Sequence, residues 1–111
     1  MKIAISSKEK DLNGEVDSVF GRCPYFLIVE IEDKKIQGFE AIENTSAEQA
    51  GGAGISTAQA VAEKDVDAII TGNIGPRALD VLGQFNIKIY NGSGSIDDVL
   101  RKFIDGKLET I

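Results

Sequence analysis

The period of the apolar residues changes partway along the chain, at about residue 44. Before that point, residues 2–6, 25–32 and 36–43 are short runs in which apolar side chains alternate with polar ones or fill both faces. Such runs are typical of strands. Residues 33–35 turn the second run back into the third, which predicts a hairpin. Because no helical stretch separates these strands, at least one of them must run antiparallel to its neighbours.

After residue 44, helical and strand patterns alternate. Helices are predicted over residues 55–64, from Pro76 to a stop at Gly83, and from the N-cap Ser95 to a stop at Gly106, with strands over 67–71 and 87–90. Strands that alternate with helices pair in parallel through right-handed crossovers. We therefore predict an α/β fold in one domain, residues 1–111, with a mixed five-stranded sheet and helices on its faces.

If strand 25–32 runs opposite to the other four strands, five loops meet at one edge of the sheet. These are residues 6–7, 21–23, 44–54, 72–75 and 91–94. Ligands of α/β sheets bind at the carboxyl edge, where helix N-termini favour anions. This topology predicts a shallow, anion-tolerant pocket that Arg22 and Arg77 flank. The candidate binding residues are Gly21, Arg22, Gly51, Gly52, Gly72, Asn73, Gly75 and Arg77. A second interpretation of these glycines remains open, because any α/β loop needs glycine for turns and caps.

Composition and charge exclude some partners. The net charge of −6 disfavours the phosphate backbone of nucleic acid, which is bound by clustered lysine and arginine. The apolar runs are far shorter than the roughly 20 residues that span a bilayer, and the N-terminal segment has no signal-peptide pattern. A single cysteine forms no internal disulfide, so we expect a cytoplasmic protein without a membrane partner.

The residues needed for common catalytic mechanisms are missing. The chain has no histidine, no Walker loop, no complete G-x-G-x-x-G and no aspartate on its first strand for a metal. We therefore expect a protein that is not an enzyme. The opposite hypothesis needs a carboxylate pair at the rim, and the sequence offers Glu48 with Asp11, Glu15 or Asp17, all on loops.

Cys23, the only cysteine, allows two interpretations. As a soft ligand, one thiolate can hold an iron of a preassembled cluster that brings its own sulfides. As a structural residue, a free cysteine acts as a small buried apolar side chain, and the residue type favours this interpretation. Cys23 is nevertheless the only candidate metal ligand of its kind in the chain.

Several segments together resemble the nitrogenase iron–molybdenum cofactor biosynthesis family, also called nitrogenase accessory factors. They are "MKIAIS", "FGRCPYF", the "GGAG" loop, "TGNIGPRALDVL" and "IKIYNGSG". The resemblance implies a three-layer, ribonuclease H-like sandwich with strand order 3-2-1-4-5 and strand 2 antiparallel. It also implies a non-catalytic carrier that binds an iron–sulfur or iron–molybdenum-type cluster or its precursor, with cluster-donor or cluster-acceptor proteins as partners.

The residues carried over from the family pattern are Phe20, Gly21, Arg22, Cys23, Gly72, Asn73, Gly75, Pro76 and Arg77. The chain departs from the pattern at Val19 and in "EQAGGAG", where many members carry histidine. The alternative function is a regulatory module that binds an organic anion or a protein partner at the same rim. Lysines and a glycine in residues 34–43 blunt an exposed edge strand, and no oligomeric state is predicted.

Overall fold

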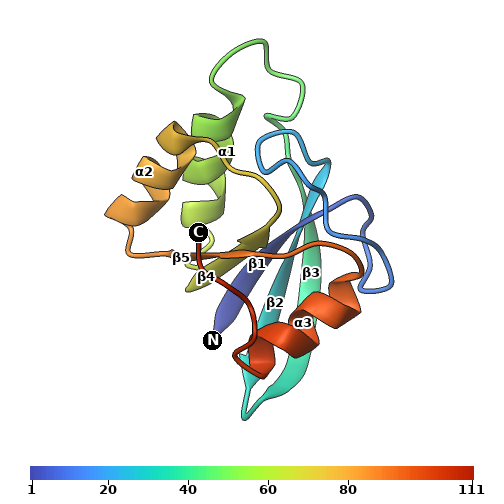
Figure 1. Ribbon diagram of the computed structural model, residues 1–111. Coiled ribbons are helices and arrows are strands. Elements are labelled where there is room, and N and C mark those ends of the chain that lie inside the picture. Colours follow the sequence, from blue (N-terminus) through green and yellow to red (C-terminus); the bar gives the residue numbers. More distant parts are fainter.

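A mixed sheet forms the middle layer of the computed structural model, which describes all 111 residues (Figure 1). The strands are β1 (Lys2–Ser7), β2 (Tyr25–Glu32), β3 (Lys35–Glu43), β4 (Ala68–Thr71) and β5 (Lys88–Asn91), in the order β3-β2-β1-β4-β5. β2 pairs antiparallel with both β1 and β3, whereas β1, β4 and β5 pair in parallel. The predicted α/β sheet, its strand order and the antiparallel second strand are confirmed.

Helices cover both faces of this sheet. The helices are α1 (Ala53–Ala62), α2 (Pro76–Gln84) and α3 (Ile96–Ile104). α1 and α2 pack on one face against side chains such as Phe26 and Ile69. α3 packs on the other face, where Ile5 and Leu27 belong to a separate apolar cluster. Since β4 is buried at every position, its apolar residues supply both cores.

Three helix boundaries differ from the prediction. α1 ends at Ala62, two residues before the predicted end at residue 64. α1 begins at Ala53, two residues early, because the small residues after Gly52 are compatible with a helical turn. α2 does not stop at Gly83 but continues to Gln84, and the chain leaves it through Asn86, which has a positive φ of 59°. Asparagine tolerates this left-handed conformation better than most residues. The cap of α3 is confirmed, since the Ser95 hydroxyl accepts a hydrogen bond of 3.0 Å from the Asp98 amide.

The β2–β3 hairpin leads to an exposed edge strand. Asp33 and Lys34 both have positive φ, 52° and 62°, as in the turns that match the twist of two-residue hairpins. In β3 the register skips Gln37 opposite Glu30 and Ile31, which is a β-bulge. Almost all of β3 is exposed. A bulge interrupts the flat row of backbone groups that another strand would need for pairing.

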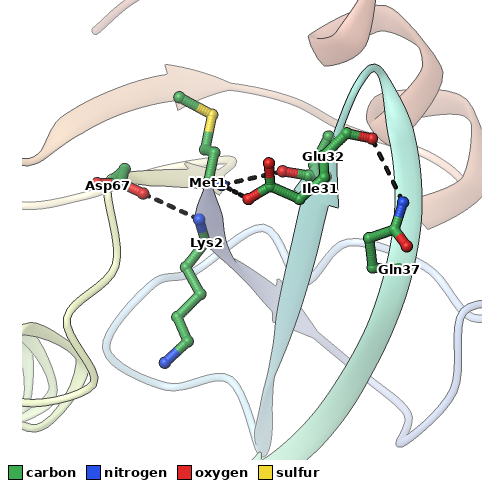
Figure 2. A network of polar contacts seen from close by, with 6 residues as sticks. All are labelled: Met1, Lys2, Ile31, Glu32, Gln37 and Asp67. Carbon is green, nitrogen blue, oxygen red and sulfur yellow. Dashed lines mark hydrogen bonds and ion pairs between the residues drawn. The ribbon is translucent and has the colours of Figure 1, made fainter.

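The C-terminal residues cover the free edge strand β5, and the N-terminus lies at the end of the central strand β1. The last residues pair along the free side of β5, with the Asn91 amide donating to the Glu109 carbonyl (2.8 Å) and the Ile111 amide to the Ile89 carbonyl (2.9 Å). At the other terminus, the Met1 ammonium donates to the Ile31 carbonyl and to the Glu32 carboxylate (Figure 2). The N-terminus therefore supports the end of the sheet opposite to the carboxyl rim, whereas the last residues cover the free side of β5.

The three helices have nine or ten residues each, and none has the length and apolar character to cross a membrane.

The close approach of two loops gives a test of this packing. An added Cβ at Gly72 would lie 2.8 Å from the Cα and the carbonyl oxygen of Ser18, both backbone atoms. We expect Gly72→Ala to lower the free energy of unfolding by about 1–3 kcal/mol, because one loop must shift. In Gly83→Ala, the new methyl group meets nothing within 4 Å, and alanine should stabilise α2 by about 0.5–1 kcal/mol. Urea denaturation of both variants checks this, and equal effects would contradict the packing.

Candidate functional site: the carboxyl rim

Loops that are distant in sequence bond to one another at the carboxyl edge of the sheet. The Phe20 amide donates to the Asn73 carbonyl (2.9 Å), and the Asn73 amide donates to the Ser18 carbonyl (2.6 Å). Beneath them, the buried hydroxyls of Ser6 and Thr71 share a hydrogen bond of 2.8 Å. The predicted meeting of the loops that end β1 and β4 with the loop that precedes β2 is therefore present in the structure.

Asn44, at the end of β3, joins a third loop to this edge. Its side-chain amide donates to the Cys23 carbonyl (2.9 Å) and the Gly21 carbonyl (3.4 Å). Its side-chain oxygen accepts from the Thr57 hydroxyl (3.2 Å) and the Ser46 amide (3.2 Å). Because Asn44 is buried, these four bonds replace water and fix the loop before β2 relative to α1.

A hollow of about 630 Å³ opens at this rim between the N-termini of α1 and α2. It contains six of the eight predicted binding residues, namely Gly21, Arg22, Gly52, Asn73, Gly75 and Arg77. Gly21 lets the loop before β2 come close to α1, because a Cβ there would lie 3.0 Å from the Gly54 Cα. The remaining lining residues are Val19, Phe20, Ala53, Gly54, Ile55, Ile74, Pro76 and Ala78.

Gly51 and Gly72, also predicted, do not line the hollow. Gly72 has no side chain and so allows the Ser18 backbone to pack against it. Gly51 belongs to the loop that leads to α1. Residues 91–94 lie at the rim but pack elsewhere, since the Gly94 carbonyl accepts from the Val16 amide (2.9 Å). Val19, Ile55 and Ile74 form an apolar wall that was not predicted among the binding residues, because these residue types are equally common in a core.

The charge of the hollow is opposite to that of the whole chain. The protein has 18 acidic residues, yet none of them lines the hollow, which contains two arginines. α1 and α2 both begin there without a side-chain cap and without an acidic residue in the first turn. α3 instead has Ser95 as its cap and Asp97 and Asp98 in its first turn. Uncapped first turns leave N–H groups and positive dipole ends available to an anion.

The two arginines have different environments. Arg22 Nη1 donates to the carbonyls of Ala47 (2.9 Å) and Gln49 (2.7 Å), so this side chain holds a neighbouring loop as well as lining the hollow. Arg77, exposed in the first turn of α2, donates no hydrogen bond to the protein. Neither forms an ion pair with an acidic side chain.

Cys23 does not face the hollow. Its side chain is fully buried in the core between the sheet and α1, and its thiol lies 3.3 Å from the Phe20 carbonyl. Burial, together with the smaller effect of the Asp17 charge, raises the pKa of Cys23 to about 12. The position favours the structural interpretation of Cys23 and lends no support to the prediction that it is a metal ligand.

No group of three or more histidine, cysteine, aspartate or glutamate side chains is arranged to hold a metal ion. Two of the carboxylates considered for catalysis instead stabilise local turns: Asp11 accepts from the Asn13 amide and Asp17 from the Val19 amide, each at 2.9 Å. A second hollow, of about 470 Å³, lies at the opposite end of the sheet beside Met1, Tyr90 and Phe103, and is mainly apolar. It shares no residue with the rim.

The sheet and the rim define a small α/β protein with a glycine-rich, basic hollow at its carboxyl edge. Residues 1–106 match the family model described as dinitrogenase iron-molybdenum cofactor, and the chain belongs to this family. It is 42% identical over 110 residues to the uncharacterized protein MJ0580 of Methanocaldococcus jannaschii, covering 98% of this chain and 90% of that protein. The same organism's uncharacterized protein MJ0327 is 30% identical over 112 residues, covering 100% of this chain and 94% of that protein.

A solved structure supports the same fold. The apo form of the orange protein from Desulfovibrio gigas superposes with a TM-score of 0.91 at 28% identity. The match covers 99% of this chain and 92% of that chain. The mixed sheet with its antiparallel β2 is therefore shared with an experimentally determined structure.

The burial of Cys23 predicts low thiol reactivity. At pH 8, we expect a thiol-specific reagent to modify Cys23 at least about 100-fold more slowly in the folded protein than in urea, because the buried thiol forms little thiolate. Absorbance of the released chromophore measures both rates. Similar rates in the two states would mean that the sulfur is accessible.

The raised pKa of Cys23 also predicts how the free energy of unfolding changes with pH. The folded pKa of about 12 lies above the usual value of 9.0, so the thiol's contribution to stability is complete below pH 9 and is lost as pH rises toward 12. We expect the difference in unfolding free energy between the wild type and Cys23→Ala to be constant from pH 7 to 8.5 and to shrink above pH 9. A difference that grows with pH would contradict this.

Proposed function

We propose that this protein binds and carries an anionic iron–sulfur-based metallocofactor, or a precursor of one, at the hollow between α1 and α2, without catalysing a reaction. The observation that carries the proposal is the charge of the site: in an acidic protein, none of the 18 acidic residues lines the hollow, which contains two arginines. Membership of the dinitrogenase iron-molybdenum cofactor family supports the choice of ligand class.

The donor groups suit a cluster better than a bare metal ion. The first turns of α1 and α2 offer backbone N–H groups, and Arg22 and Arg77 offer guanidinium donors, all of which bind anions. No thiolate or imidazole is available there for direct coordination, since Cys23 is buried and the chain has no histidine. A ligand that brings its own sulfides needs only charge complementarity and shape from the protein.

Transient binding is consistent with this arrangement. Hydrogen bonds and charge hold a ligand without a covalent or coordinate bond, so the ligand can be passed to another protein. We therefore propose cluster-donor or cluster-acceptor proteins as partners. The related orange protein is described in an apo form, a term used for a protein without its ligand.

A second candidate function is supported by the walls of the hollow. Val19, Ile55, Ile74 and Pro76 give it an apolar lining beside the positive groups. An organic anion or the acidic tail of a protein partner combines the same two properties, an apolar body and a negative charge. A regulatory module that binds such a ligand is therefore the alternative to a cluster carrier.

The test is anaerobic incubation with ferrous iron and sulfide, followed by removal of unbound material and measurement of sulfur-to-iron charge-transfer absorbance. We expect the wild type to retain the chromophore and Arg77→Gln to bind it about tenfold more weakly, a loss of about 1.4 kcal/mol, because one charge-assisted contact is removed. Cys23→Ala should bind as the wild type does. Arg101→Gln, on the distant α3, is the matched charge control.

The outcome separates the two functions. Binding that depends on Cys23 rather than on Arg77 would contradict the proposed mode of recognition. If the wild type retains no chromophore, a thermal-shift series with nucleotides and carboxylates decides the alternative, since a ligand of the folded state raises its apparent stability.

A further inference from the structure

The loop that enters α1 depends on one side chain for its position. We call residues 45–51 the entry loop; in Figure 1 it is the green segment that rises beyond the N-terminal end of α1. Its own hydrogen bonds are local, such as Ala47 amide to Asn44 carbonyl (3.2 Å) and Gln49 amide to Ser46 carbonyl (3.1 Å). The only hydrogen bonds that reach it from outside residues 44–52 come from Arg22 Nη1.

Arg22 has donors left for a ligand after it holds this loop. A guanidinium has five N–H donors, and the two on Nη1 account for the carbonyls of Ala47 and Gln49. The donors on Nε and Nη2 bond to no protein acceptor, although Arg22 lines the hollow. This side chain has no carboxylate partner in a chain with 18 acidic residues. One edge of the guanidinium is thus used by the loop, and the other remains available.

The entry loop is in turn connected to the hollow. It continues directly into Gly52, whose φ of 71° begins α1, and into Ala53 and Gly54, which line the hollow. At its other end the buried Asn44 is fixed by four hydrogen bonds. The loop is therefore anchored at both ends, and between them its backbone is held in place by Arg22 alone.

We propose that Arg22 is a positioning residue that clamps the entry loop beside the hollow, and that an anion bound at the free edge of its guanidinium tightens the clamp. The first part concerns the protein without ligand, and only the second rests on the proposed function. An anion that engages Nε and Nη2 immobilises the side chain, so the bonds from Nη1 to the loop are broken less often. Occupancy of the hollow thereby orders a segment whose own residues do not line it.

Proteolysis of the entry loop tests the clamp in the free protein. Glu48 is the only acidic residue of the loop, so a glutamate-specific protease reports its opening through fragments 1–48 and 49–111, followed by mass spectrometry. We expect Arg22→Gln to raise the rate of cleavage after Glu48 about fivefold, because the carbonyls of residues 47 and 49 lose their donor. Arg22→Lys, which keeps a donor, should show a smaller increase.

Arg77→Gln is the matched control, because it removes the other cation of the hollow without touching the loop. It should leave cleavage in the free protein unchanged. Circular dichroism establishes that each variant is folded. Equal cleavage rates in wild type, Arg22→Gln and Arg77→Gln would overturn the clamp, whatever the ligand is.

Sodium molybdate, added in millimolar excess, probes the coupling. We expect it to raise the melting temperature of the wild type and to slow cleavage after Glu48 about threefold or more, and to have no effect on cleavage of Arg22→Gln. If molybdate raises the melting temperature but leaves the cleavage rate of the wild type unchanged, the proposed coupling between anion binding and the entry loop is wrong. If neither molybdate nor the iron–sulfide mixture binds the wild type, the proposed function fails, while the comparison in the free protein still decides the clamp.

Discussion

The direction of β2 is the constraint on which the rest of the structure depends. Because β2 runs antiparallel between β1 and β3, the start of β2 and the end of β3 lie at the same edge as the ends of β1, β4 and β5. In an all-parallel sheet, the loop before the second strand would lie at the opposite edge, about 20 Å away for strands of six residues. The hydrogen bonds between Phe20 and Asn73, and between Arg22 and the entry loop, exist only because of this reversal.

Much of the fold was predictable because apolar periodicity is a local property that survives into the structure. The range of β2 was predicted from it. The cap of α3 at Ser95 was predicted from its capping pattern, and the gathering of the rim loops from an antiparallel second strand. The end of α2 was not, since glycine stops some helices and is tolerated in others, and here Asn86 supplies the left-handed residue. The sequence also could not reveal which carbonyls Arg22 binds, because a side chain of that length reaches partners 25 and 27 residues away only after the sheet has formed.

The candidate site was predictable in outline but not in detail. Glycines and arginines indicated the rim because their residue types are informative there. Val19, Ile55 and Ile74 were missed because nothing in an apolar side chain distinguishes the wall of a hollow from the interior of a core. The two interpretations of Cys23 could not be separated in sequence, since they differ only in which way the side chain points. Burial beneath Asn44 and beside Phe20 decides that direction.

The chemistry of the lining residues determines how the charge of this hollow depends on pH. Its positive groups are two guanidiniums and backbone amides, and no carboxylate, imidazole, thiol or amine side chain lines it. Its positive character is therefore the same in a mildly acidic and in a mildly alkaline medium. A relative with imidazole groups at the corresponding rim would gain or lose charge near neutrality. In this chain, any acid–base sensitivity of an occupant must originate in the occupant itself.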